Sequence, residues 1–198
     1  GVPGALGLFL RSKLYPLLLG SCGRGVAFGT GVVLRHPHKI HIADNVVVDD
    51  GCCLDAKGQD NAGIRIGRGV FLGRNTILSC KNGDIVIEDE ANIGFNTEIF
   101  SASRVRVGKK VLIAAYTYLV GGDHLYDRVD IPVLDQGRTA AGIDIGDHVW
   151  LGAHVVVTDG SRVGRDAIVG AGAVVVGEIP EFAIAVGTPA KVVRDRRA

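Results

Sequence analysis

The sequence predicts an all-β fold in which short strands coil around a triangular prism, and three observations support it. Aliphatic residues recur every six positions through the last third of the chain: Ile145, Leu151, Val157, Val163, Val169 and Val175. Glycine follows the aliphatic residue at 146, 152, 164 and 170. A small or β-branched residue comes four positions after each aliphatic residue. Glycine is also abundant, with 29 residues, about twice the average usage of roughly 7%, as a fold with many corners requires.

The six-residue period determines the geometry, because it fits neither an α-helix nor simple strand alternation. Three six-residue sides would close one turn of a triangular prism, so that a coil takes roughly 18 residues and the domain has about five or six coils. The aliphatic residue would point inward and stack on its equivalent one coil away. We expect the neighbouring glycine to adopt a corner conformation that a Cβ would resist.

The same pattern returns earlier in the chain with shifts in register. Its aliphatic triplets are Ile42, Val48 and Leu54; Ile66, Leu72 and Leu78; Ile87, Ile93 and Ile99; and Val107, Ile113 and Leu119. A polar insertion over 57–63 causes the first shift, and Asn45, Asn75 and Asn82 suit tight turns because asparagine tolerates positive φ. The longest interruption lies between Leu119 and Ile143. We therefore expect a repeat domain over 25–194 with an inserted, protruding loop over 120–142, where function usually concentrates.

Residues 1–24 precede the repeats, and we expect them to form a short helical segment. Residues 2–19 are apolar nearly all round, with Arg11 and Lys13 in the middle and Pro16 interrupting a single long helix. This stretch is too short and too charged for a membrane span. It suits a cap over the open end of the prism, which we favour, or an interfacial segment whose cations contact anionic head groups.

Charge and cysteine usage limit the other partners. The net charge of +1 gives no broad attraction for nucleic acid. The four cysteines (Cys22, Cys52, Cys53 and Cys80) have no metal-binding spacing. With no recognisable signal peptide they indicate a reduced protein, either free in the cytoplasm or at the inner face of the membrane. The cluster of His36, His38 and His41 matches no zinc signature, so we interpret these as surface histidines and expect no metal.

The repeat over 145–175 resembles the hexapeptide-repeat acyltransferases, whose fold is a left-handed parallel β-helix. The tail over 185–194, Ala-Val-Gly-Thr-Pro-Ala-Lys-Val-Val-Arg, resembles the sugar O-acetyltransferase and xenobiotic acetyltransferase branch. The resemblance implies a homotrimer with three active sites between neighbouring chains. It also implies acetyl-coenzyme A as acyl donor and a sugar or polysaccharide precursor, lipid-linked or free, as acceptor.

His124 is the candidate general base. Acyl transfer to a hydroxyl needs a base for the hydroxyl proton and a donor for the oxyanion, and histidine suits the base because its unperturbed pKa lies near 6.5. His124 follows Gly121-Gly122 at the start of the excursion, where the family places its catalytic histidine. The segment Gly-Gly-Asp-His-Leu-Tyr-Asp resembles the polysaccharide-modifying enzymes, which favours O-transfer. The partner of the imidazole stays open among Asp123, Asp127, Asp130 and Glu98.

The resemblance also implies the substrate-binding residues. On the acceptor side these are Asn96, within Ile-Gly-Phe-Asn, and Asp123 and Tyr126 in the excursion. On the donor side, backbone amides at Gly152-Ala153 and Gly170-Ala171 would bind the pantetheine arm beside Trp150, and Lys191 and Arg194 would meet the nucleotide phosphates.

Three alternatives remain. N-acetyl transfer to an amino sugar uses the same machinery. A γ-type carbonic anhydrase would need three histidines around zinc, whereas His148 and His154 are six apart and occupy equivalent positions on successive sides. A non-enzymatic β-helix used for assembly would not need the histidine in the long excursion.

Overall fold

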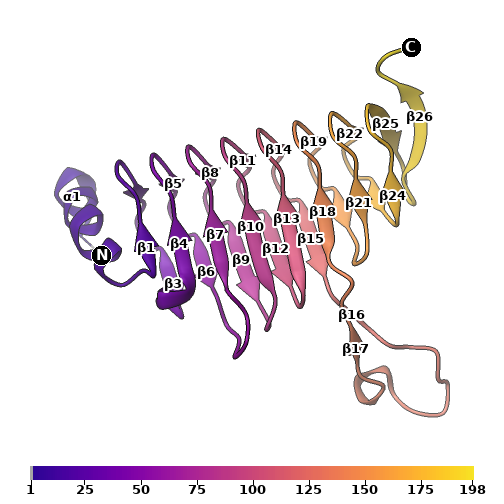
Figure 1. Ribbon diagram of the computed structural model, residues 1–198, viewed down its shortest axis with the longest axis horizontal. Helices are drawn as coiled ribbons and strands as arrows, with labels where there is room; N and C mark the ends of the chain where they lie inside the picture. Colours follow the sequence, from indigo (N-terminus) through magenta and orange to yellow (C-terminus); the bar gives the residue numbers. More distant parts are fainter. Residues whose placement is uncertain (1) are drawn as a thin grey trace.

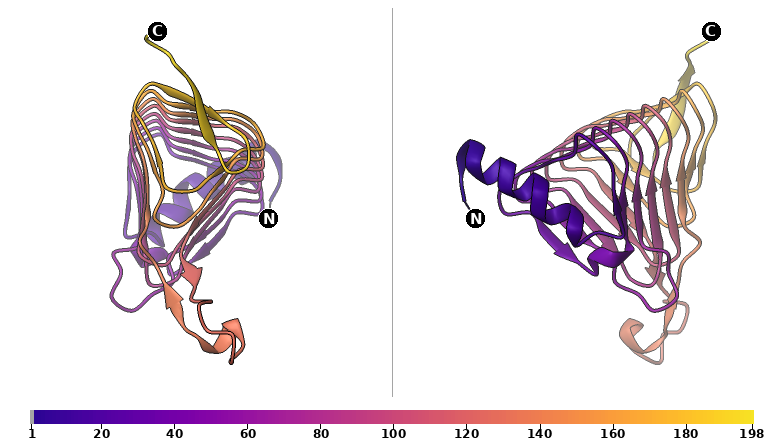
Figure 2. Two further views of the ribbon diagram at one scale, coloured as in Figure 1. Left: turned by 90° about the vertical axis from the view of Figure 1, so that its right-hand side faces the viewer. Right: turned by 60° about the vertical axis from the view of Figure 1, so that its left-hand side comes forward.

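The computed structural model describes residues 2–198 and shows a parallel β-helix, as predicted (Figure 1). Three parallel sheets form the three sides of the prism, and the coils are left-handed (Figure 2). We call the corner between sheets one and two the first corner, that between sheets two and three the second, and that between sheets three and one the third.

The strands of each sheet follow one another at intervals of one coil. Sheet one contains β1 (Ser21–Cys22), β4 (Ile40–Ile42), β7 (Ile64–Ile66), β10 (Asp84–Ile87), β13 (Arg104–Val107), β18 (Ile143–Ile145), β21 (Arg162–Val163) and β24 (Glu178–Ile179). Sheet two contains β2 (Ala27–Phe28), β5 (Val47–Val48), β8 (Phe71–Leu72), β11 (Asn92–Ile93), β14 (Leu112–Ile113), β19 (Trp150–Leu151), β22 (Ile168–Val169), β25 (Ala183–Val186) and β26 (Lys191–Asp195). Sheet three contains β3 (Val33–Arg35), β6 (Cys53–Asp55), β9 (Ile77–Cys80), β12 (Glu98–Ser101), β15 (Tyr118–Gly121), β20 (Val156–Val157) and β23 (Val174–Val175).

The number of coils differs from the prediction. Sheet one has eight strands, so the described chain makes about eight turns, and the expected five or six is wrong. The terminal coils account for the difference because they lack the clean six-residue pattern. Val26, Phe28 and Val32 form the core of the first coil, and the last coil closes with β25, which pairs antiparallel with β26.

The core is the column of inward-pointing aliphatic side chains that the periodicity predicts. Every member of the six-residue series from Ile145 to Val175, and of the four earlier triplets, is buried. The residues four positions later, from Val149 to Ala173, are buried too, with Ser161 as the polar member. Strict stacking of apolar side chains therefore determines the register between coils.

The repeat glycines have a different role from the one expected. Gly146, Gly152 and Gly164 are not among the residues with positive φ. A Cβ on Gly152 would lie 2.5 Å from the backbone nitrogen of Ala171, and one on Gly146 would lie 2.6 Å from that of Arg165. These glycines let successive coils approach, and the left-handed conformation occurs two positions later.

That later position has positive φ in coil after coil. At the second corner, Asn75, Asn96, Tyr116 and His154 have φ of 58°, 53°, 60° and 59°. Asn45 and Asn82 have φ of 58° and 63° at other corners, which confirms the turns expected for these asparagines. Asparagine adopts this region more readily than most residues because its short polar side chain can bond locally.

The N-terminal segment lies at the first coil. Helix α1 (Gly4–Leu14) and the 3₁₀ turn η1 (Tyr15–Leu17) lie across the open end of the prism (Figures 1 and 2). Arg11 Nε donates to the Phe28 carbonyl at 2.8 Å, and the rings of Tyr15 and Phe28 meet edge to face. The outer side of this segment remains exposed, as at Leu17.

The excursion leaves the third corner between β15 and β18 and therefore covers 122–142. It begins and ends in a small antiparallel ladder of β16 (Asp123–His124) and β17 (Arg138–Thr139), and it contains the 3₁₀ turn η3 (Val133–Asp135). Asp159 fixes its base, because its carboxylate accepts from the Ala141 and Gly142 N–H groups at 2.7 and 2.8 Å. At the tip, the Gln136 amide binds both the N–H and the carbonyl of Arg128.

Candidate functional site

His124 lies at the start of the excursion, in the wall of a cleft at the third corner. The ladder pairs it with Arg138, and its own N–H donates to the Asp123 carboxylate at 2.7 Å. The cleft has a volume of about 330 Å³, and its lining consists of Lys81, Phe100, Ala102, Gly122, Asp123, His124, Arg138, Thr139 and Ala140. The predicted base therefore borders a hollow large enough for part of a small ligand.

The imidazole of His124 makes no hydrogen bond within the described residues. Its Nδ1 atom is buried and has no hydrogen-bond partner within residues 2–198. None of the four candidate partners reaches it, because Asp123 binds the backbone and Asp130 pairs with Arg128. A buried polar atom without a partner is rare and costly, so this nitrogen is able to bind a group from outside the described chain.

Lys81, Phe100 and Arg138 line the cleft, although we did not predict them from the sequence. The coil spacing contained a signal for the first of these, because Cys80, Ser101 and Gly121 are partners across adjacent strands. The next residue in each coil, Lys81, Ala102 and Gly122, lines the cleft. Arg138 required knowledge of the β16–β17 ladder, which no periodicity predicts.

Two predicted acceptor residues lie apart from this cleft. Asn96 is at the second corner, where its Oδ1 accepts from the Asn75 side chain at 3.0 Å. Tyr126 extends from the excursion with 68% of its surface exposed. Neither residue contributes to the lining around His124, so only Asp123 of the acceptor set lies beside it in one chain.

The predicted donor residues gather along the second corner and sheet two. Trp150 is half exposed on the outer face of β19, and Gly152-Ala153 and Gly170-Ala171 follow β19 and β22 in adjacent coils. Within residues 2–198 the Ala153 and Ala171 N–H groups donate to no backbone carbonyl. A row of unused N–H groups beside an exposed indole can bind the amide carbonyls of an extended ligand.

The predicted basic residues of the tail lie on β26, which extends sheet two at the C-terminal end of the prism. Lys191 and Arg194 are both exposed, and neither forms an ion pair within the described chain. Nearby Asp195 binds Arg197 instead. Both cations are therefore available to bind an anion. The donor residues at the second corner are separated from His124 by the width of sheet three.

The described residues contain no metal site of ordinary composition. Across residues 2–198, no three His, Cys, Asp or Glu side chains are arranged to hold a metal ion. His36 binds Asp55 at 3.0 Å and His41 binds Ser21 at 3.0 Å. His148 pairs with Asp166, and His154 stacks on the Tyr116 ring with centroids 5.0 Å apart. Each of these histidines therefore has a local structural contact.

Comparison with known proteins agrees with the fold and the repeat. Residues 142–177 match the family model described as bacterial transferase hexapeptide (six repeats). A probable acetyltransferase of Mycobacterium tuberculosis is 35% identical over 69% of this chain and 45% of its own length. A putative lipopolysaccharide biosynthesis O-acetyl transferase of Escherichia coli is 29% identical over 72% of this chain and 75% of its own. The chain thus spans less than half of the first relative and three quarters of the second.

Solved structures share the architecture. AntD, an N-acyltransferase from Bacillus cereus in complex with dTDP and 3-hydroxybutyryl-CoA, aligns with a TM-score of 0.67 over 94% of this chain and 88% of that one, at 20% identity. At this identity the likeness concerns the fold, and the sequence matches concern the repeat and its relatives. Together they show that the repeat and the fold of this chain are similar to those of hexapeptide-repeat acyltransferases.

Proposed function

We propose that this protein transfers an acetyl group from acetyl-coenzyme A to a hydroxyl of a sugar or polysaccharide precursor. The observation that carries the proposal is His124, whose Nδ1 is buried without a partner beside the cleft at the base of the excursion. The relationship to a putative O-acetyl transfer enzyme supports the reaction class. N-transfer to an amino sugar is the second candidate, because AntD has the same fold.

In the proposed mechanism His124 removes the proton of the acceptor hydroxyl while the oxygen attacks the thioester carbonyl. The tetrahedral intermediate places negative charge on the former carbonyl oxygen, which a backbone N–H such as that of Ala153 would stabilise. When the intermediate collapses, the C–S bond breaks and the coenzyme A thiolate takes the proton from the imidazolium. A group bound to Nδ1 would fix the tautomer and stabilise this cation.

We further propose that each active site forms between two chains of a homotrimer. The donor residues Trp150, Ala153 and Ala171 lie at the second corner, whereas His124 lies at the third. One prism cannot bring both corners to the same acetyl group, because sheet three separates them. If the second corner of one copy meets the third corner of its neighbour, the donor reaches His124 and a partner for Nδ1 becomes available.

Coenzyme A would then run along the second corner towards the C-terminal end. The pantetheine amides would bind the free N–H groups of Ala153 and Ala171 and lie against Trp150. Lys191 and Arg194 would meet the phosphates, since exposed cations without partners bind such groups readily.

Residues 2–19 are proposed to contact the inner face of a membrane peripherally. Val2, Leu6, Phe9, Leu14, Leu17 and Leu18 are all more than 40% exposed, and large exposed apolar patches mark interaction surfaces. Residues 1–43 contain five Lys or Arg and no Asp or Glu, which complements anionic lipid. Among residues 2–198, no helix combines the length and apolar character needed to cross a membrane.

Vesicle co-sedimentation tests this contact. The protein should bind vesicles of phosphatidylcholine with phosphatidylglycerol more strongly than phosphatidylcholine alone, and the combined Leu6→Ser, Phe9→Ser and Leu17→Ser variant should lose most of the binding. The matched control replaces Val129 and Leu134, which are equally apolar and exposed on the excursion. Equal losses in both variants, or no lipid preference, would exclude residues 2–19 as the contact.

Thermal unfolding with acetyl-coenzyme A, and separately with zinc, tests the proposed reaction class. A ligand at about 100 times its dissociation constant adds roughly 2.7 kcal/mol to the free energy of unfolding, so a clear rise in Tm is expected with acetyl-coenzyme A alone. A rise with zinc alone would favour carbonic anhydrase chemistry. No rise with either would favour a non-enzymatic β-helix. Testing glucosamine and glucose as acceptors, and determining whether each product is an amide or an ester, then separates N-transfer from O-transfer.

A further inference from the structure

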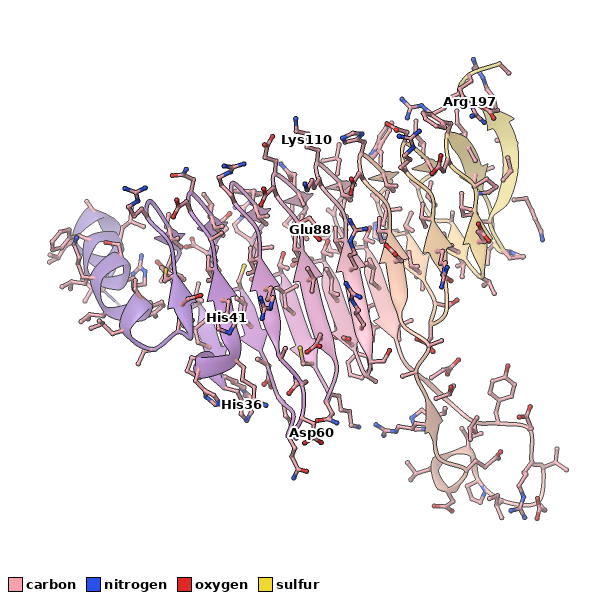
Figure 3. All side chains as sticks on the ribbon, in the orientation of Figure 1. His36, His41, Asp60, Glu88, Lys110 and Arg197 are labelled. Carbon is pink, nitrogen blue, oxygen red and sulfur yellow. The ribbon has the colours of Figure 1, made fainter. Side chains whose placement is uncertain are left out.

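A second hollow adjoins the His124 cleft along the third corner. His36, Lys57, Gly58, Gln59, Lys81 and Asn82 line it, and Lys81 also lines the cleft. His36 and Asp60 lie along the lower edge of the prism in Figure 3, and the excursion projects from the same edge (Figure 1). The proposed catalytic cleft therefore continues towards the N-terminal coils as a groove.

Lys57 and Lys81 occupy equivalent positions in adjacent coils. Asp55 and Ser79 are strand partners two residues before them, and the Asn82 N–H donates to the Lys57 carbonyl at 3.0 Å. Adjacent coils are about 4.8 Å apart, so both lysine side chains can reach one anion bound between them. Like charges directly opposite each other on neighbouring strands are destabilising, and a bound anion would relieve that repulsion.

The cations of the groove lack partners. Within residues 2–198, Lys57, Lys81 and Arg138 form no ion pair, and their side chains make no hydrogen bond (the described ion pairs of this corner join Asp55 to Arg35 and His36). Asp123 is the single carboxylate in either lining, and its charge already faces the His124 N–H. The two linings together contain three cations and one carboxylate, an excess of positive charge that favours a bound anion.

Hydrogen bonds also hold the backbone that surrounds the second hollow in place. Lys39 Nζ is surrounded by the Gly58 carbonyl, the Gln59 carbonyl and Asn61 Oδ1, at 2.8, 3.2 and 3.0 Å. Asn82 Oδ1 accepts from the backbone N–H groups of Gln59 and Asp60. The polar insertion over 57–63 is therefore fixed on the corner, and the ordering of its backbone is complete before any ligand binds.

Small residues separate the lysines from His124. Ala102 and Gly122 follow Lys81 in the next two coils, and a Cβ on Gly122 would lie 2.8 Å from the Cβ of Ala102. Two coils correspond to about 10 Å along the prism, a span that a charged monosaccharide can bridge. Phe100 supplies an apolar wall against which a sugar ring can pack.

We propose that the acceptor is anionic and that Lys57 and Lys81 bind its phosphate or carboxylate while a ring hydroxyl lies at His124. Arg138 is a further cation beside the end of the acceptor that reacts. This inference rests on the proposed acetyl transfer but adds the substrate class. In the proposed trimer coenzyme A would run from His124 towards the C-terminal end, whereas Lys57 and Lys81 lie in coils on the N-terminal side of His124. The groove thus recognises the acceptor independently of coenzyme A.

Calorimetric titration of the full chain tests the proposal with three probes that share a hexose ring: glucose 1-phosphate, glucuronate and glucose. At least one anion should bind at least tenfold more tightly than glucose, and the two anions separate phosphate from carboxylate recognition. Raising the salt from about 20 mM to about 200 mM should weaken the anion and leave glucose unchanged. Equal binding of all three, or no binding of either anion, would overturn the proposal.

The combined Lys57→Met and Lys81→Met variant should weaken the bound anion at least tenfold and leave the acetyl-coenzyme A dissociation constant within twofold. Methionine keeps an unbranched side chain, and both lysines are exposed, so the fold should persist. Lys109→Met is the matched control, an exposed lysine at the first corner. Equal weakening of acetyl-coenzyme A would assign the lysines to donor phosphates instead and overturn the proposal. Absence of acetyl-coenzyme A binding in the wild type would contradict the reaction class, whatever the anion result.

Discussion

Individual glycines determine how closely successive coils pack. Gly146 has ordinary φ, yet a Cβ there would lie 2.6 Å from the Arg165 nitrogen of the next coil. Gly172 is the opposite case, because it has φ of 71° and a Cβ would meet nothing within 4 Å. The same residue type therefore meets two different demands at neighbouring points of the repeat.

These demands predict opposite results for two substitutions. Gly146→Ala should lower the free energy of unfolding by about 1–3 kcal/mol, the usual range for overpacking, as measured by urea denaturation. Gly172→Asn should change it by less than about 0.5 kcal/mol, because Asn75 and Asn96 adopt the same left-handed conformation at equivalent corner positions. If Gly146→Ala proves as mild as Gly172→Asn, close approach of the coils does not explain the repeat glycine.

At the scale of a single sheet, charged side chains connect adjacent coils on the outer face of sheet one. Arg106 on β13 reaches Glu88, Asp144 and Asp147 at 3.4, 3.1 and 3.2 Å. Asp147 also accepts from the Lys109 N–H at 2.9 Å. That backbone bond, together with Arg106, lowers the pKa of Asp147 below its ordinary value.

The direction of this pKa shift predicts how stability depends on pH. A lowered pKa in the folded state means that ionised Asp147 stabilises the fold above the ordinary value of 3.8, and that this contribution is lost as pH falls through the folded-state pKa. Asp147→Asn should therefore lower the free energy of unfolding at pH 7, by no more than about 1 kcal/mol because the carboxylate is partly exposed. The difference from wild type should shrink towards pH 3.

Asp144→Asn is the control, since Asp144 contacts Arg106 but accepts no backbone N–H. Asp144→Asn should lower the free energy of unfolding at pH 7 by less than Asp147→Asn does. An Asp147→Asn difference that stays constant down to pH 3 would show that the carboxylate charge contributes nothing.

The sequence predicts the core of the prism better than its last coil or the residues that line the cleft. The six-residue period identified the core because inward stacking depends only on residue size and spacing, and every predicted aliphatic position is buried. The last coil was not predicted, since Ala183 and Ala185 belong to the core outside the six-residue series. Lys81 and Arg138 were not predicted to lie beside His124. The place of Lys81 depends on how insertions shift one coil against the next, and that of Arg138 depends on the β16–β17 ladder.

At the scale of the whole molecule, the prism distributes two proposed half-sites over different corners. Unused backbone N–H groups and Trp150 lie along the second corner, and His124 borders the third. This separation explains why sequence reasoning could assign roles to residues without predicting which of them meet. Asn96 is an example, because it lies at the second corner whereas His124 borders the third.

The measurement that tests the central claim most directly compares acetyl transfer by His124→Ala with wild type, using the sugar that the wild type acetylates fastest and following release of coenzyme A. His148→Ala serves as control, because His148 is exposed at the first corner and pairs with Asp166. The proposed role predicts a loss of turnover of roughly 10²–10⁴-fold, the usual contribution of a general base, with acetyl-coenzyme A affinity nearly unchanged. Turnover within about threefold of wild type would contradict the assignment of His124 as the base.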